Sequence, residues 1–261
     1  QKFSLENGFT LKDASAFNIT FHEGKPIFID TLSFDFYKEN SPWFAYKQFI
    51  MHFLGPLVLS QYYGHDYLKT LSHDLEGYSL EKISKILPFK SYLNPTILTN
   101  IHLLARYDKK FTLDTKKAKN NLSKKSQLKL IEILHDYIKN LGVNINTEWD
   151  NYYYQTNYKE ESYNIKKRIT RAWFSSIKGR NLIDIGGNDG TFSRELKDVA
   201  NFIIVADIDP NAVQQNYVQL QKNKEKYILP IVVDVLNPAS SYGFDNQERF
   251  SFINRVKDMK L

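Results

Sequence analysis

The sequence predicts an α/β protein whose second half holds a parallel sheet and whose first half is mostly helical with one β-hairpin. Short apolar runs recur in the second half at 182–185, 202–206 and 228–236. Segments of helical length separate these runs. Strands that alternate with helices are typical of βαβ units, in which the strands lie parallel.

The first apolar run leads into a glycine-rich turn, Gly186-Gly187-Asn188-Asp189-Gly190, called the glycine turn below. Glycine lets the backbone bend sharply and approach a ligand closely, because it has no Cβ. We expect a helix from Thr191 to about Ala200, and its first turn would point unpaired N–H groups toward the bend. The second run ends on Asp207, whose carboxylate can accept hydrogen bonds from both hydroxyls of a ribose. This order predicts half of a nucleotide-binding βαβ unit.

Acidic side chains distinguish the glycine turn from a dinucleotide-binding fingerprint. The turn lacks the second glycine of Gly-x-Gly-x-x-Gly. Asp184 lies within the preceding strand and Asp189 within the turn itself. Their carboxylates repel a pyrophosphate but suit a ligand with positive charge, and S-adenosylmethionine carries an ammonium and a sulfonium group. The alternative is an ordinary α/β turn whose glycines serve only its geometry.

The stretch from Asp184 to Asp207 resembles the first two motifs of the class I S-adenosylmethionine-dependent methyltransferases. Their first motif is an apolar strand with an acid followed by Gly-x-Gly-x-Gly, and Asn188 stands here in place of the middle glycine. The acid that ends their second strand is matched by Asp207. The resemblance implies a Rossmann-like fold with S-adenosyl-L-methionine as cofactor. It also implies the residues that bind this cofactor: Asp184, Gly186, Gly187, Asn188, Asp189, Gly190, Asp207, Ile208 and Asp234.

The resemblance assigns a role to each part of this set. Asp184 and Asp189 would favour the methionine ammonium and nearby polar groups. Asp207 would hold the ribose, and Ile208 would press on a face of the adenine. Asp234 or its neighbouring backbone would meet the adenine amino group. No catalytic base is named, because the acceptor is unknown.

The assigned strands account for only part of such a fold. A class I methyltransferase has a fourth strand, whose end contributes to the reaction site, and then three more. An open edge of buried parallel strands is costly. We therefore expect residues 143–261 to form a cofactor-binding domain that is incomplete at its C-terminus, either because the chain is a fragment or because a partial fold survives. The helix at about 160–178 is expected to cover the sheet with one apolar stripe: Ile165, Ile169, Ala172, Trp173 and Ile177.

Residues 1–142 are expected to form a mostly helical domain with a β-hairpin. The hairpin is indicated by β-prone runs at 19–21 and 27–29 around a loop that contains Gly24. Four helices are expected: one after Pro42 that kinks or splits at Gly55-Pro56, one that starts at Ser79, one from Pro95 to about Arg106, and one over Leu128–Ile138 that stops at Gly142.

Asp13, Asn18 and Asp30 stand around this hairpin in an order similar to that of kinase-like folds. Those folds use an aspartate, an asparagine five residues on and an aspartate after a hairpin to hold a substrate hydroxyl and magnesium. Here no His-Arg or His-Gly precedes Asp13, and no glycine follows Asp30. The pattern indicates a kinase-like remnant in which these side chains cap turns and bond internally. Residual nucleotide or phosphoryl chemistry is the alternative.

The first half also carries a resemblance of its own. DASAFNITFHEGKPIFIDTLSFD, followed by WFAYKQFIMHFLGPLVL, resembles the amino-terminal region of bacterial methyltransferases related to a rhizobial nodulation protein. In those proteins such a region precedes the methyltransferase fold, and the likeness covers most of the chain in the same order. A link to glycan or lipid-sugar modification is an association only.

Composition excludes several classes of protein. The chain has no cysteine, which excludes a disulfide framework and a thiolate metal site and fits a cytoplasmic location. No apolar run approaches the length of a membrane span. The net charge of +6 comes mostly from lysines and gives little support for a nucleic-acid partner. Lys166, Lys167 and Arg168 are interpreted as solvated. The aromatic residues within 147–163 could line an acceptor pocket or pack a helix onto the sheet.

The sequence thus predicts an S-adenosylmethionine-dependent methyltransferase, or the cofactor-binding portion of one, that acts on an unknown small-molecule or glycan acceptor. The alternative is a non-catalytic pseudo-enzyme or interaction module that retains a partial methyltransferase fold. The oligomeric state is not predicted.

Overall fold

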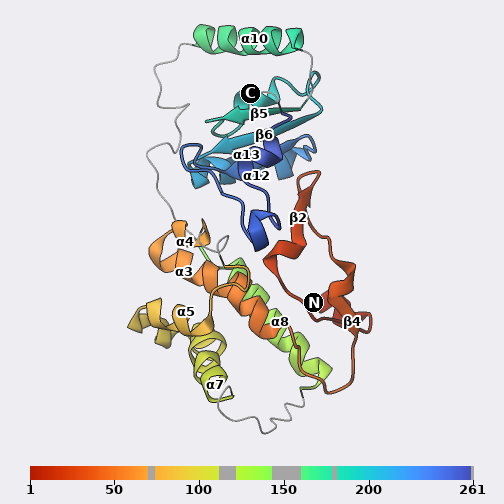
Figure 1. Cartoon of the computed structure of the whole chain (residues 1–261), viewed down its shortest axis with the longest axis vertical. Helices are drawn as coiled ribbons and strands as arrows, with labels where there is room; N and C mark the ends of the chain where they lie inside the picture. Colours follow the sequence, from red (N-terminus) through yellow and green to blue (C-terminus); the bar gives the residue numbers. More distant parts are fainter. Residues whose placement is uncertain (70–73, 112–121, 143–159, 178–180, 260–261) are drawn as a thin grey trace. The chain divides into compact units, whose positions relative to one another are not determined.

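The computed structural model describes residues 1–69, 74–111, 122–142, 160–177 and 181–259. It has a mixed α/β structure, as the sequence predicts, and its small sheets include one of three parallel strands (Figure 1). The chain divides into two compact units: residues 1–20 with 28–144, and residues 21–27 with 145–261. The expected boundary at 142/143 stays a prediction, because residues 143–159 lie outside the described part of the chain.

The first unit is built mostly from helices. β1 (Phe9–Leu11) pairs antiparallel with β4 (Phe34–Phe36). β2 (Ile19–His22) pairs with β3 (Lys25–Phe28), and residues 21–27 of this hairpin belong to the second unit. The helices, with η for 3-10 and π forms, are α1 (Lys2–Glu6), η1 (Ala16–Asn18), η2 (Thr31–Ser33), α2 (Tyr46–Phe49), η3 (Ile50–Leu54), α3 (Gly55–Tyr63), α4 (Asp66–Lys69), α5 (Leu80–Ile86), η5 (Phe89–Leu93), α6 (Pro95–Ile97), η6 (Leu98–Leu103), α7 (Leu104–Phe111) and α8 (Lys124–Lys139).

The hairpin forms where the sequence predicts it, with a shorter turn than expected. β2 and β3 extend to His22 and Lys25, so only Glu23 and Gly24 lie between them. These two residues have φ values of 49° and 73°. Two positive φ angles are characteristic of a type I′ turn, whose twist matches that of the strands it joins.

The helical predictions hold with small corrections. At Gly55-Pro56 the π-helix η3 continues directly into α3, because Leu54 and Gly55 both keep right-handed helical angles; the helix therefore does not split there, and its hydrogen-bond pattern changes from π to α. Ser79 caps α5, because its Oγ accepts a hydrogen bond of 3.3 Å from the N–H of Lys82. α8 ends at Lys139 with Asn140 at its cap, so the expected stop at Gly142 is wrong.

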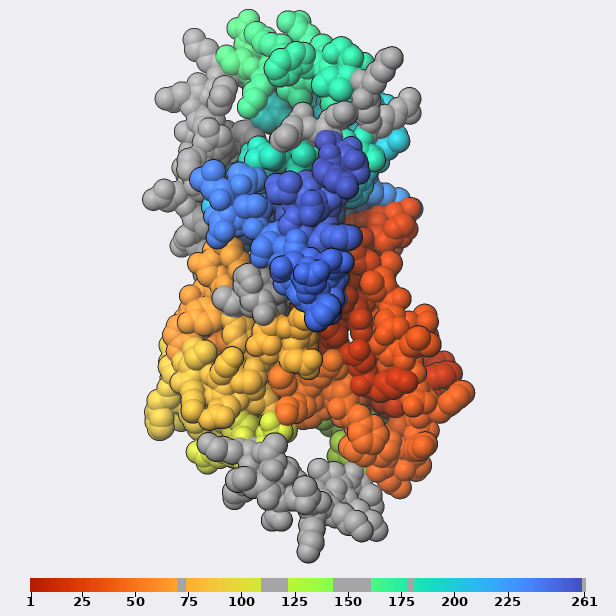
Figure 2. Space-filling view, viewed as in Figure 1, coloured from red at the N-terminus to blue at the C-terminus, as the bar shows by residue number. Residues whose placement is uncertain are grey.

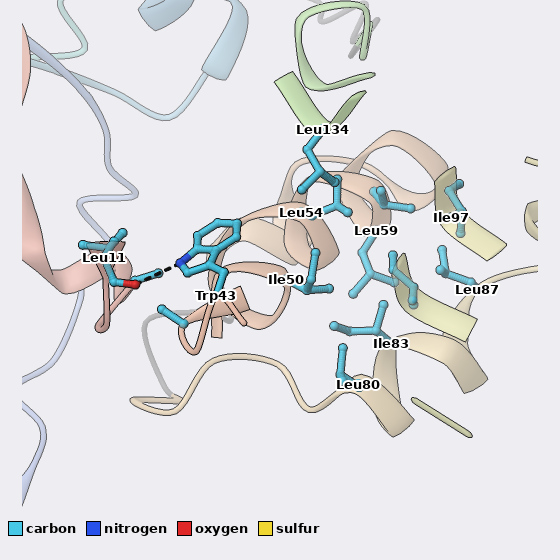
Figure 3. Close-up of a cluster of buried hydrophobic side chains, with 14 residues drawn as sticks. Leu11, Trp43, Ile50, Leu54, Leu59, Leu80, Ile83, Leu87, Ile97 and Leu134 are labelled. Atoms are coloured by element: carbon cyan, nitrogen blue, oxygen red, sulfur yellow. Dashed lines mark hydrogen bonds between the residues drawn. The ribbon is translucent and has the colours of Figure 1, made fainter. Parts of the chain in front are cut away.

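Aliphatic side chains from these helices form the core of the first unit (Figure 3). Trp43 closes one side of it, and its indole N–H donates a hydrogen bond of 2.9 Å to the carbonyl oxygen of Leu11. Burying an aliphatic side chain of this size stabilises the fold by about 1.5–3 kcal/mol. The largest side chains of this unit that are fully buried are Leu5, Ile50, His52, Leu54, Leu59, Leu80, Ile83, Ile97 and Ile101.

The second unit contains the parallel sheet, with strands in the order β5 (Asn181–Ile185), β6 (Phe202–Asp207), β7 (Ile228–Val232). α10 (Glu160–Ser176) precedes β5, α11 (Thr191–Arg194) lies between β5 and β6, and α12 (Pro210–Asn223) joins β6 to β7. The short η7 (Phe244–Asn246) and α13 (Phe252–Val256) follow. Alternate residues of each strand point to opposite faces. One face packs with α10 and α12 through Phe174 and Leu220, and the other packs with α13 through Phe252 and Val256.

Two predicted elements of this unit are shorter than expected. α11 ends at Arg194, and the chain continues in turns to Ala200, in which the N–H of Ala200 donates to the carbonyl of Leu196 (2.8 Å). β7 ends at Val232 rather than Leu236. Asp234 ends the extended segment, since its Oδ1 accepts the N–H of Leu236 (3.0 Å) and so folds the backbone into a turn.

α10 presents a different face to the sheet than the sequence predicts. Phe174 is the buried apolar residue, with 8 % of its surface exposed, whereas Ile165, Ile169 and Trp173 of the predicted stripe are 42 %, 55 % and 76 % exposed. Two ion pairs accompany this rotation of the helix, Lys167 with Glu195 (2.7 Å) and Arg171 with Asp198 (3.3 Å), but both are partly exposed and add little to the packing of Phe174. Residues 167, 171 and 174 share one helical face at a spacing of four and three.

The edge strand β7 contains a proline. Pro230 lies on the open side of β7, because the N–H of Val233 and the carbonyl of Tyr227 bond to β6 and alternate residues face alternate sides. A proline there discourages further pairing.

The C-terminal segment (blue in Figure 2) exposes Leu236, Phe244 and Phe250. Among the helices that the structure describes, none is long and apolar enough to cross a membrane.

Candidate cofactor-binding site

The predicted cofactor residues gather at the carboxyl ends of the three parallel strands. The glycine turn (residues 186–190) follows β5, Asp207 is the last residue of β6, and Asp234 comes shortly after β7. The N–H of Val233 donates to the carbonyl of Asp207 at 2.8 Å, which keeps the ends of β6 and β7 together. In open parallel sheets this is the edge at which ligands bind.

The glycine turn owes its bend to three residues in the left-handed region: Gly186 (φ 71°), Asn188 (φ 48°) and Gly190 (φ 77°). A Cβ added to Gly186 would meet no atom within 4 Å, so open space lies in front of this residue. A Cβ on Gly187 would instead lie 2.6 Å from Cγ1 of Val205 and 2.9 Å from the carboxyl group of Asp184. Gly187 is therefore required by packing, while Gly186 offers bare backbone to a ligand.

Asp207 connects the glycine turn to the residues after β6. Its Oδ2 accepts the N–H of Asn188 at 2.8 Å, and its Oδ1 accepts the N–H of Asp209 at 2.9 Å. The residue is 9 % exposed. An ionised carboxylate has about four acceptor positions, so both oxygens keep capacity for a further donor such as a ribose hydroxyl. Beside it Ile208 is 52 % exposed, as a residue that packs on an adenine would be.

Asp184 is a half-buried acid next to the glycine turn. Its Oδ2 accepts a hydrogen bond of 2.6 Å from the hydroxyl of Ser193. Burial raises the pKa of Asp184; the bond from Ser193 and the positive charge of Lys166 act against this rise, and the charge of Asp207 adds to it. A cation placed beside Asp184 would therefore be stabilised.

Asp189 and Asp234 are engaged in the local backbone. Oδ1 of Asp189 accepts both the N–H (3.0 Å) and the hydroxyl (2.7 Å) of Thr191, so this acid serves the first turn of α11. Asp234 bonds within its own turn, as described above. The structure thus brings all the predicted residues to one edge, but Asp184 and Asp207 are the acids built into its centre.

Sequence reasoning did not identify Arg194, which supports the glycine turn from beneath. Its guanidinium donates to the carbonyl of Asp189 (2.6 Å) and to Oδ1 of Asn216 (2.8 Å), and it pairs with Glu225 (2.9 Å). A Cβ on Gly190 would lie 2.6 Å from Asn216. In the sequence, an arginine soon after Gly190 indicates this supporting role only weakly, because its acidic partner, Glu225, lies 31 positions further on.

A cleft of about 300 Å³, called the α10 cleft below, borders the glycine turn. α10 contributes Lys166 and Trp173, β5 contributes Asp184, and α11 contributes Phe192 and Ser193; Gly186 and Gly187 also line it. The Nζ of Lys166 lies 4.2 Å from the centre of the Phe192 ring. Lys166 is exposed, as its interpretation as solvated expects, and it also lines the α10 cleft, whereas Lys167 is half-buried and ion-paired.

In the first unit, the residues of the kinase-like pattern hold the local structure. Asp13 accepts hydrogen bonds from the side chain of Gln48 (2.7 Å) and the N–H of Ser15 (3.0 Å). Asn18 donates to the hydroxyl of Ser33 (3.1 Å), which donates to Asp30 (2.5 Å). In the portion of the chain that is described, no cluster of three or more His, Asp or Glu side chains could hold a metal ion. The aromatic residues at 147–159 lie outside that portion.

The comparisons with known proteins found one curated relative of note. The chain is 29 % identical over 262 residues to the nodulation protein NoeA of Rhizobium meliloti (strain 1021). The match covers 96 % of this chain and 54 % of NoeA, so the chain spans about half the length of this relative. No family model and no solved structure matches. The likeness agrees with the resemblance of the first half to proteins related to a rhizobial nodulation protein.

Proposed function

We propose that the second unit is a Rossmann-like domain that binds S-adenosyl-L-methionine, and that the protein is a methyltransferase or its cofactor-binding portion. The observation that carries this proposal is the link between Asn188 and Asp207 beside the open backbone of Gly186. It sets a carboxylate with spare acceptor capacity against a backbone that a ligand can approach. When bound, the cofactor would supply a methyl group on its sulfonium for transfer to an acceptor.

The residues present fit this cofactor better than a dinucleotide. The half-buried Asp184 and the charge of Asp207 would repel a pyrophosphate, and both favour a cationic ligand. Asp207 would hold the ribose, Ile208 and Asp234 the adenine, and Asp184 the ammonium. The acceptor, a small molecule or a glycan, has no assigned residues, and no catalytic base is proposed.

Calorimetric titration with S-adenosylhomocysteine tests the proposal. We expect the unmodified chain to bind and Asp207→Ala to lose binding. The matched control is Asp209→Ala, which removes an equally buried acid: Asp209 is 3 % exposed and caps α12 through the N–H of Asn211 (2.9 Å). Loss of this cap costs about 1 kcal/mol. The control should destabilise the unit but still bind the ligand.

Two results would contradict the proposal. The first is a folded, unmodified chain that takes up no S-adenosylhomocysteine, which would favour the non-catalytic module. The second is equal loss of binding in both variants, which would show that Asp207 acts only through stability. Thermal unfolding of each variant establishes that it is folded at the temperature of the titration.

A further inference from the structure

The α10 cleft carries side chains of opposite charge close to the glycine turn. Asp184 enters it from β5 and Lys166 from α10. Lys166 is near enough for its positive charge to favour the ionised form of Asp184. The two groups are nevertheless held by different neighbours: Asp184 bonds to the hydroxyl of Ser193 (2.6 Å), and the ammonium of Lys166 lies over the ring of Phe192 (4.2 Å).

A carboxylate and an ammonium in one cleft form the complement of a zwitterion. The α-ammonium of an amino acid is attracted to the first and its α-carboxylate to the second. Hydrogen bonds between ionised groups are roughly twice as strong as those between neutral ones. The arrangement also discriminates, because a ligand with only one of these charges leaves the other protein group uncompensated.

The size and the other walls of the α10 cleft suit the amino-acid end of a larger ligand. Its volume of about 300 Å³ is at the lower limit of pockets that hold drug-sized molecules. Trp173 and Phe192 supply apolar surface for the methylene groups of a side chain. Gly186 and Gly187 line the α10 cleft as well as forming the glycine turn, so one ligand can extend from the cleft toward the carboxyl end of β6.

We propose that Lys166 binds the carboxylate of the methionine portion of the cofactor, beside the ammonium that the proposed function assigns to Asp184. This inference rests on the proposed function, since it concerns the same ligand. It gives α10 a binding role in addition to its packing role.

The test compares two ligands and two lysine variants by calorimetric titration. S-adenosylhomocysteine carries the amino-acid end, whereas 5′-methylthioadenosine lacks both its carboxylate and its ammonium. We expect Lys166→Met to weaken binding of S-adenosylhomocysteine about tenfold or more, the loss expected for a charge-assisted hydrogen bond, and to leave binding of 5′-methylthioadenosine within about twofold. Lys166→Arg should restore most of the affinity.

The matched control is Lys167→Met on the same helix. Lys167 pairs with Glu195 (2.7 Å) rather than lining the α10 cleft, so its loss should leave both affinities unchanged. If the unmodified chain binds neither ligand, the proposed function itself fails. If it binds S-adenosylhomocysteine and Lys166→Met binds equally well, this inference alone is wrong. Equal weakening of both ligands would also overturn it, because the effect would not depend on the amino-acid end.

Discussion

The backbone N–H of Asn188 donates a hydrogen bond of 2.8 Å to Oδ2 of Asp207, so the acid that ends β6 holds the turn that follows β5. The other oxygen, Oδ1, accepts the N–H of Asp209 at 2.9 Å. One carboxylate thus fixes the loops after two neighbouring strands. Asp207 is therefore both a structural link and a candidate ligand-binding group, and its two roles need separate measurements.

The structural role of Asp207 predicts a large loss of stability when it is removed. Asp207→Ala leaves two backbone N–H groups without their acceptor, and each such buried group costs about 1–3 kcal/mol. We expect the free energy of unfolding of the second unit to fall by about 2–6 kcal/mol. Urea unfolding followed by circular dichroism measures it. A loss no larger than that of an exposed alanine substitution would show that the two bonds contribute little.

Gly186 and Gly187 should respond differently to the same substitution. Alanine at Gly187 meets Val205 and Asp184 at less than contact distance and should destabilise the unit by about 1–3 kcal/mol through overpacking. Alanine at Gly186 meets open space, so its cost is the left-handed backbone alone, about 1–2 kcal/mol.

Binding separates the two glycines further. Under the proposed function, the new methyl group of Gly186→Ala occupies the space through which the ligand approaches the backbone. We expect this variant to stay folded and to lose S-adenosylhomocysteine affinity by about tenfold or more, about 1.4 kcal/mol. Titration of folded protein gives the affinity. Unchanged affinity in Gly186→Ala would place the ligand away from the glycine turn.

Asp30 is predicted to matter for stability and not for nucleotide binding. It accepts the N–H of Leu32 (2.9 Å) and the hydroxyl of Ser33 (2.5 Å), so Asp30→Ala should cost the first unit about 1 kcal/mol, as the loss of a cap does. Titration with magnesium and ATP should give the same result for the unmodified chain and the variant. Magnesium-dependent ATP binding that Asp30→Ala abolishes would instead support the kinase-like alternative.

The parts of the fold that could be predicted are those with local signals. Apolar runs bounded by turn residues located β5 and β6. The start of α12 carries such a signal in Asp209-Pro210, because an acid at the cap accepts a free N–H group and a proline in the first turn lacks an N–H that would need a partner. The glycine turn and Asp207 were predicted for the same reason: each is recognised from residues next to it in the sequence.

The parts that could not be predicted depend on contacts between distant residues. The face that α10 turns to the sheet is set by the packing of Phe174 with Leu182 and Leu196, which periodicity within α10 cannot reveal. The tip of the hairpin belongs to the second unit, where the carbonyl of Gly24 accepts a hydrogen bond from Gln221, 197 positions away. Lys166 was interpreted as solvated for the same reason, since only the fold brings it to Asp184.

Replacing the acid Asp184 by asparagine should change stability and ligand binding in opposite directions. Burial raises the pKa of this carboxyl above its ordinary value of 3.8. Between that value and the raised pKa, the folded state holds a proton that the unfolded state has released. Stability therefore falls as pH rises through this interval and stays lower above it. Asp184→Asn removes the ionisation, and its amide oxygen can still accept the hydroxyl of Ser193.

We accordingly expect Asp184→Asn to unfold at a higher temperature than the unmodified chain at pH 7, with the difference shrinking as the pH is lowered toward 3.8. The same variant should bind S-adenosylhomocysteine about ten- to a hundredfold more weakly, because a hydrogen bond to a charged group contributes about 1.5–3 kcal/mol. Scanning calorimetry over pH and titration at pH 7 measure the two effects. A variant that is less stable at every pH would show that the charge of Asp184 is already compensated within the fold, by the hydroxyl of Ser193 and then by Lys166, without a ligand.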